Sequence, residues 1–137
     1  MNDEAASGCY LLPDRAESAG LARTHVRAFL LARRATHLTD DATLLVSELV
    51  TNALLHAPGK PELRLHLGES VLRIEVVDGG SGVPHRMHPT ADRASGRGLI
   101  LVEAIASAWG VTHTADTKSV WCELPLTAPH RTPAARR

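Results

Sequence analysis

One stretch decides the fold of this chain: ELVTNALLH, residues 48–56. It belongs to a helical pattern that begins at Thr39 or Asp40, both good N-caps, and ends before Pro58. Because successive helical residues turn by about 100°, Glu48 and Asn52 project from one face, at the border of the apolar stripe. A carboxylate and a carboxamide at that border predict a cleft in which one group handles a proton and the other holds a hard cation.

Two glycine segments follow this helix in the sequence: DGGSG, residues 78–82, and GRGL, residues 96–99. The residues between them are rich in Gly, Pro, His, Ser and Asp, a composition typical of a lid or binding loop. The second glycine segment opens a further helix, whose N-terminal amides and dipole favour phosphate oxygens. Together with residues 48–56, these segments indicate a magnesium-nucleotide site.

The periodicity of the remaining sequence predicts the elements around this site. Strands are expected at residues 9–12, 62–67, 71–77, 111–114 and 119–124, and helices at 14–35, 39–57 and 99–108. This order predicts an α/β (α+β) sandwich, in which a mixed, mostly antiparallel sheet is covered on one face by about three helices. A Rossmann unit and a P-loop enzyme are excluded, because strands and helices do not alternate strictly and no Walker-type lysine follows a glycine segment.

The composition limits the class of protein. A chain of 137 residues suits one domain with a single core. Apolar residues make up 44% and aromatic residues only 3%, so the core has to be built from Leu, Val, Ile and Ala. Fifteen basic and fifteen acidic residues give a net charge of zero, which argues against direct nucleic-acid binding through bulk positive charge.

The two ends of the sequence differ from its middle. We expect a flexible N-terminus at residues 1–8, one domain at residues 9–126 and a disordered basic tail at residues 127–137. The sequence shows no secretory signal and no apolar run near the roughly 20 residues of a membrane span, so a cytoplasmic location without membrane contact is expected. Cys9 and Cys122 have neither metal-ligand nor disulfide spacing, and both are expected to be buried thiols.

In this order, and with these elements between them, the three segments resemble the N, G1 and G2 boxes of the GHKL ATPases, the superfamily of gyrase, histidine kinases and their relatives. The small size, the absence of a dimerisation or phosphoacceptor-histidine domain, and the closing KSVWCEL at residues 118–124 are similar to the anti-sigma-factor serine kinases, the RsbW-like group. The resemblance spans residues 14–126. It implies the Bergerat ATP-binding fold, with ATP and Mg²⁺ as ligands.

The resemblance also implies roles for single residues. Glu48 matches the general base of the family, Asn52 matches its magnesium ligand, and Asp78 matches the aspartate that accepts a hydrogen bond from the adenine amine. Ser119 stands where the family often has a threonine beside the adenine pocket. The other residues implied in nucleotide binding are Gly80, Gly82, Gly96, Arg97, Gly98 and Leu99.

Simpler interpretations of the same residues stay open at this point. Glu48 can be an exposed carboxylate of a helix surface, and Asn52 can be a hydrogen-bonded amide on the same face. Asp78 can cap a turn, and Arg97 can be solvated. The glycines can serve tight turns without any ligand.

The function implied by the resemblance is that of an anti-sigma regulatory factor. Such a protein phosphorylates a serine or threonine of a small antagonist protein with ATP and sequesters a sigma factor, and the resemblance suggests a homodimer. Two alternatives from other classes remain: a non-catalytic module that binds adenine nucleotide to control a protein partner, and a simple ATPase domain.

Overall fold

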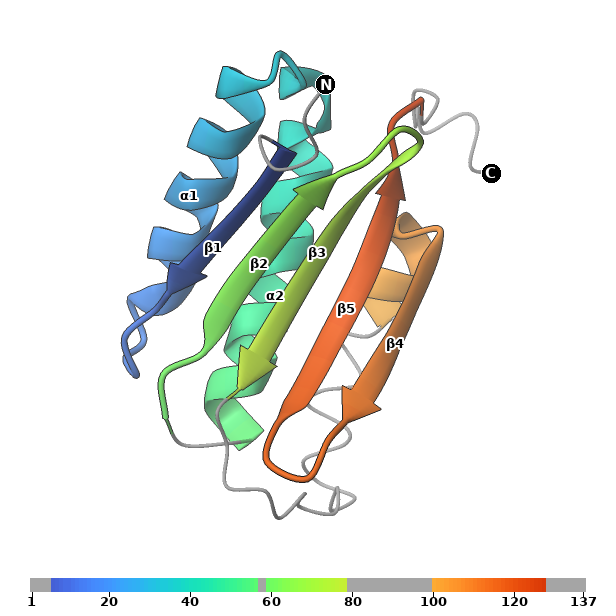
Figure 1. Cartoon of the computed structure of the whole chain (residues 1–137). Coiled ribbons are helices and arrows are strands. Elements are labelled where there is room, and N and C mark those ends of the chain that lie inside the picture. The colour runs from blue at the N-terminus through green and yellow to red at the C-terminus, as the bar shows by residue number, and fades with distance from the viewer. Residues whose placement is uncertain (1–5, 57–58, 79–99, 128–137) are drawn as a thin grey trace.

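The computed structural model describes residues 6–56, 59–78 and 100–127 of the chain. These residues form two layers, a sheet and the helices packed against it (Figure 1). In chain order the elements are β1 (Ser7–Leu11), α1 (Ser18–Ala32), the 3₁₀ helix η2 (Thr36–Leu38), α2 (Thr39–His56), β2 (Glu62–Leu67), β3 (Val71–Asp78), β4 (Ala108–His113) and β5 (Lys118–Pro125). Residues 100–105 are also helical.

The described strands form one sheet in the order β1-β2-β3-β5-β4. Every neighbouring pair of strands is antiparallel, and β2 and β3 form the expected hairpin. The described helices lie on one face of this sheet, and none of them covers the other face, which we call the open face (Figure 1). The predicted fold class, an α+β sandwich with a mostly antiparallel sheet covered on one face by helices, is therefore confirmed, and all described strand pairs are antiparallel.

Alternation along β2 and most of β3 divides the sheet into a core face and an open face. On β3 the side chains of Leu72, Ile74 and Val76 are almost completely buried, whereas the residues between them are partly exposed. The core face meets an apolar stripe of α2 that includes Leu45 and Leu49. The other strands contribute Leu63, Leu65, Val120, Cys122 and Leu124 to the core. The helices and the segments next to them contribute Leu12, Ala22, Val26, Phe29, Leu30, Ala35, Leu38, Ala42, Val46, Val50, Ala53 and Val102.

Helix α1 is shorter than expected at both ends. The Ser18 hydroxyl donates a hydrogen bond to the carbonyl of Pro13, which holds the preceding residues in a turn. At the other end Arg34 has a φ of 59°, in the left-handed region, and the Ala35 amide donates to the Leu30 carbonyl at 2.9 Å. This backbone arrangement ends a helix, and it is here made by an arginine where glycine is the usual residue.

The chain after residue 100 enters the sheet earlier than expected. A helix through Ala108 and a strand from Val111 were predicted, but the Ser107 amide already donates to the Glu123 carbonyl at 2.8 Å, and β4 begins at Ala108. Pairing with β5 decides this boundary, because Trp109 lies opposite Cys122 and packs against the core. The hydrophobic pattern of residues 99–108 carries no information on this contact between two strands.

The open face of the sheet carries a layer of polar and aromatic side chains. The Arg73 guanidinium lies 4.3 Å from the centre of the Trp121 ring and 3.4 Å from the Glu123 carboxylate. Trp121 in turn covers Gly110, where an added Cβ would lie only 2.7 Å from the ring. A glycine at this position therefore permits the ring to lie flat along β4.

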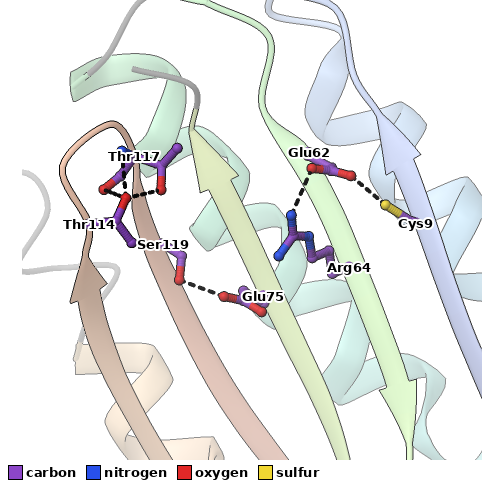
Figure 2. Close-up of polar contacts among 7 residues, drawn as sticks. All are labelled: Cys9, Glu62, Arg64, Glu75, Thr114, Thr117 and Ser119. Atoms are coloured by element: carbon purple, nitrogen blue, oxygen red, sulfur yellow. Dashed lines mark hydrogen bonds and ion pairs between the residues drawn. The ribbon is translucent and has the colours of Figure 1, made fainter. Parts of the chain in front are cut away.

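One of the two cysteines lies on this open face, which corrects the expectation of two buried thiols. Cys122 is buried, but Cys9 is exposed on the edge strand β1, and its thiol donates a hydrogen bond to the Glu62 carboxylate. Glu62 also pairs with Arg64 at 3.2 Å, so the three side chains form a row across β1 and β2 (Figure 2). The hydrogen bond to Glu62 raises the pKa of the Cys9 thiol, and burial raises the pKa of Cys122 to about 12.

The helices offer no membrane span within the residues that the structure describes. None of them combines the length and the apolar character that crossing a bilayer requires.

Candidate functional site

Three predicted site residues and one further residue, Lys118, belong to elements that meet at one end of the two layers (Figure 1). Glu48 and Asn52 lie in the second half of α2, Asp78 is the last residue of β3, and Lys118 is the first residue of β5. The end of α2, the end of β3 and the start of β5 meet at the same end of the molecule (Figure 1). The fold therefore brings together a helix face and two strand ends that are far apart in the sequence.

Glu48 and Asn52 occupy the border of the buried stripe of α2, as predicted. Both are half-buried, whereas their neighbours Leu49 and Val50 are fully buried. Residues four apart on a helix are neighbours on one face, so the carboxylate and the carboxamide lie one above the other. Both side chains therefore stand at the edge of the core.

The Asn52 side chain carries an unsatisfied polar atom. Its Oδ1 is buried and has no hydrogen-bond partner among the described residues. A buried acceptor without a partner costs about 1–3 kcal/mol, and a bound ligand is one arrangement that would satisfy it. A neutral carboxamide oxygen is a suitable ligand for a hard cation whose other ligands are phosphate oxygens and waters, and Asn52 therefore fits Mg²⁺.

The helix turn that carries Glu48 is fixed to α1. The Arg23 guanidinium donates a hydrogen bond of 2.9 Å to the Ser47 hydroxyl, which itself donates to the Thr43 carbonyl at 2.9 Å. These bonds hold the residue before Glu48 on the α1 side of the helix. Glu48 is thus placed by a rigid element, which is what a positioned proton acceptor requires.

The carboxylate of Asp78 is buried. It is only 5% exposed, at a position where β3 still pairs with β5. The alternation that turns Leu72, Ile74 and Val76 inward also turns Asp78 toward the helix face. The end of β3 thus places a buried carboxylate on the same face of the sheet as the helices.

Ser119, which the resemblance puts beside the adenine pocket, lies on the face of the sheet opposite to Asp78. It pairs with Val77 on β3, and its hydroxyl donates a hydrogen bond of 2.6 Å to the Glu75 carboxylate on the open face (Figure 2). Side chains one residue apart on a strand point to opposite faces, so Ser119 and Asp78 are separated by the sheet. A hollow of about 380 Å³ on this open face, lined in part by Glu75, is for the same reason separate from the site of Asp78.

The residue that does lie beside Asp78 is Lys118, which the sequence analysis missed. In the register of β3 and β5, Lys118 is the direct partner of Asp78. It shares the helix face with Val120 and Cys122, which are buried in the core. The alternation of Val120, Cys122 and Leu124 was a signal that could have assigned Lys118 to this face.

Six predicted site residues lie outside the described part of the chain. They all belong to the two glycine segments: Gly80, Gly82, Gly96, Arg97, Gly98 and Leu99. The expected lid between these segments lies outside it as well. The roles of these residues in nucleotide binding stay predictions.

A comparison with known families decides the identity of this arrangement. Residues 38–128, more than half of the chain, match the family described as "Histidine kinase-, DNA gyrase B-, and HSP90-like ATPase". The chain belongs to this GHKL ATPase family. It therefore carries an ATP-binding domain, and the matched span contains Glu48, Asn52, Asp78 and Lys118. The search of curated proteins found no match for the GHKL chain.

Proposed function

We propose that this GHKL protein binds Mg-ATP and transfers the γ-phosphoryl group to a serine or threonine hydroxyl of a small antagonist protein, in the manner of an anti-sigma-factor kinase. The observation that carries the proposal is the pair on α2: a buried carboxamide oxygen without a partner in Asn52, and a half-buried carboxylate one turn away in Glu48. A cation ligand next to a proton acceptor is the pair that phosphoryl transfer requires.

Each described residue has one task in this proposal. Asp78 accepts a hydrogen bond from the amine of adenine, which selects an adenine nucleotide. Asn52 holds Mg²⁺ through Oδ1, and the bound ion would neutralise charge on the phosphates. Glu48 accepts the proton of the attacking hydroxyl. The product is a phosphorylated side chain on the partner protein, with ADP as the other product.

The proposed partners are supported by the resemblance and not by the residues of the site. The resemblance to the RsbW-like group supports a sigma factor and an antagonist protein as partners, and a homodimer as the assembly. It also favours a regulatory role in transcription within the cytoplasm. None of these follows from Glu48, Asn52 or Asp78, because the same residues would serve transfer to any hydroxyl.

Incubation with γ-labelled ATP and antagonist proteins encoded near this chain tests the proposal. The wild type should label one antagonist, and Glu48→Gln should reduce the rate of labelling by about 10²- to 10⁴-fold with nearly unchanged ATP affinity. Glu69→Gln is the matched control, since Glu69 is exposed in the β2–β3 turn at the opposite end of the sheet.

Three other outcomes would contradict the proposed kinase or its mechanism. Release of labelled phosphate into water without labelling of any protein would identify a simple ATPase. ATP binding with neither transfer nor hydrolysis would identify a non-catalytic regulatory module. An active Glu48→Gln protein would remove Glu48 from the mechanism.

A further inference from the structure

We infer that Lys118 is a second residue of the nucleotide site that recognises the base. Its ammonium group donates a hydrogen bond to N1 of the adenine, and the amine of the same adenine donates a hydrogen bond to Asp78. This inference rests on the proposed binding of an adenine nucleotide. It assigns a specificity-determining role to a residue for which the sequence analysis proposed none.

The register of the sheet places the two side chains together. Asp78 and Lys118 are direct partners in the antiparallel pairing of β3 and β5. Side chains that are directly opposite in such a pair have Cβ atoms about 4.5–5.5 Å apart and stand on the same face of the sheet. Here that face is the one covered by the helices, because Val76 and Val120, two residues further into the sheet, are both buried in the core.

The Lys118 ammonium is available for a ligand. It has no hydrogen bond or ion pair to another of the described residues. The side chain is half-buried rather than fully exposed, at the end of the sheet where Asp78 lies. A flexible four-carbon stem carries three donors, which lets the ammonium reach a base that is held by the carboxylate next to it.

The two groups match the edge of adenine. The carboxylate of Asp78 is an acceptor, and the ammonium of Lys118 is a donor. Adenine presents the amine at C6, a donor, beside N1, an acceptor, so one base can bind both side chains at once. Guanine presents the reverse order, with an acceptor at C6 and a donor at N1. Lys118 therefore adds selectivity to the contact made by Asp78.

Binding of ADP and of 1-deaza-ADP, which lacks only the N1 acceptor, to wild type and Lys118→Met tests the inference by calorimetry. The wild type should bind 1-deaza-ADP about 10-fold or more weakly than ADP, since a hydrogen bond to a charged group is lost. Lys118→Met should bind both ligands with similar affinity. The diphosphate is the same in both ligands, so the general effect of a lost positive charge cancels in this comparison.

Two further variants complete the experiment. Lys118→Arg keeps a charged donor and should retain part of the preference for ADP over 1-deaza-ADP. Lys60→Met removes an equal charge from the exposed residue before β2 and should leave that preference unchanged. Thermal unfolding of each variant confirms that it is folded before binding is measured.

The outcomes separate this inference from the proposed function. Suppose that the wild type binds ADP and that Lys118→Met lowers the affinities for ADP and for 1-deaza-ADP by the same factor. Lys118 then acts through its charge alone, and the inference is overturned while nucleotide binding stands. If wild type binds neither nucleotide, the proposed function fails and the inference fails with it. Equal affinity of the wild type for both ligands also overturns the inference.

Discussion

Ser119 and Glu75 are joined across β5 and β3: the Ser119 hydroxyl donates a hydrogen bond of 2.6 Å to the Glu75 carboxylate on the open face of the sheet. Asp78 faces the opposite side of the same sheet, toward the helices. The contact thus gives Ser119 a structural partner on the face opposite to Asp78. It leads to a prediction that separates the two faces.

Ser119→Ala should lower the free energy of unfolding and leave ADP affinity unchanged. The variant removes a hydrogen bond to a charged group in a side chain that is only 6% exposed, and such bonds contribute about 1.5–3 kcal/mol. Urea denaturation measures the first effect and calorimetry the second. Ser119→Thr keeps the hydroxyl and serves as the control. A tenfold loss of ADP affinity in Ser119→Ala that Ser119→Thr restores would show that the hydroxyl reaches the nucleotide.

Asp78→Asn should weaken ADP binding by about 1–3 kcal/mol, because the amide retains the volume of the carboxylate but loses its charge-assisted hydrogen bond. Calorimetry of ADP and GDP measures the effect, and the loss should be larger for ADP. The matched control is Asp40→Asn, since Asp40 is exposed in the first turn of α2, at the other end of the helix. Unchanged ADP affinity in a folded Asp78→Asn protein would show that Asp78 does not contact the base.

Asn52→Leu should abolish the magnesium-dependent part of ATP binding without destabilising the ligand-free protein. Leucine branches at the same position as asparagine, and it replaces a buried oxygen that has no partner among the described residues. Removal of an unsatisfied buried acceptor is neutral or stabilising, by up to about 1–3 kcal/mol. Chemical denaturation without ligand, and ATP titrations with and without Mg²⁺, measure the two effects.

The opposite result for Asn52 is equally informative. A loss of more than about 2 kcal/mol of unfolding free energy in Asn52→Leu would show that the carboxamide has a structural partner. Asn52 would then be an ordinary helix-face amide, which is the simpler interpretation of the sequence.

The two cysteines should react very differently with a thiol reagent. The thiolate is the reactive form, and burial raises the pKa of Cys122 to about 12, so only Cys9 should be modified in the folded protein at pH 8. The Glu62 carboxylate raises the pKa of Cys9, which lowers the fraction of thiolate at that pH. Glu62→Gln should therefore lower this pKa and increase the rate of modification.

The pH dependence of labelling checks the sign of this effect. The rate for Cys9 should rise with pH, and the midpoint of that rise should move to lower pH in Glu62→Gln. Glu69→Gln, which changes an exposed carboxylate far from Cys9, should give the wild-type profile. Equal midpoints in all three proteins would show that the contact between Cys9 and Glu62 does not form in solution.

The spacing of apolar residues was sufficient to predict several helices and strands. The predicted strands at residues 62–67 and 71–77 match β2 and β3 to within one residue, and α2 begins at the predicted cap Thr39. Glu48 and Asn52 were correctly assigned to the border of the buried stripe, because a period of 3.6 residues defines the faces of a helix from the sequence alone. The sequence thus determined the fold class and half of the described site.

Contacts between strands decided what the sequence did not. Whether Ser119 or Lys118 stands beside Asp78 depends on the register of β5 against β3, and a shift of one residue moves every side chain to the other face. The start of β4 at Ala108 and the exposure of Cys9 on the edge strand depend in the same way on which strands pair and which face the helices cover. Strand pairing and the packing of helices on the sheet bring together residues that are distant in the sequence. The hydrophobic pattern of a short segment cannot predict these contacts, so the tertiary structure alone determines them.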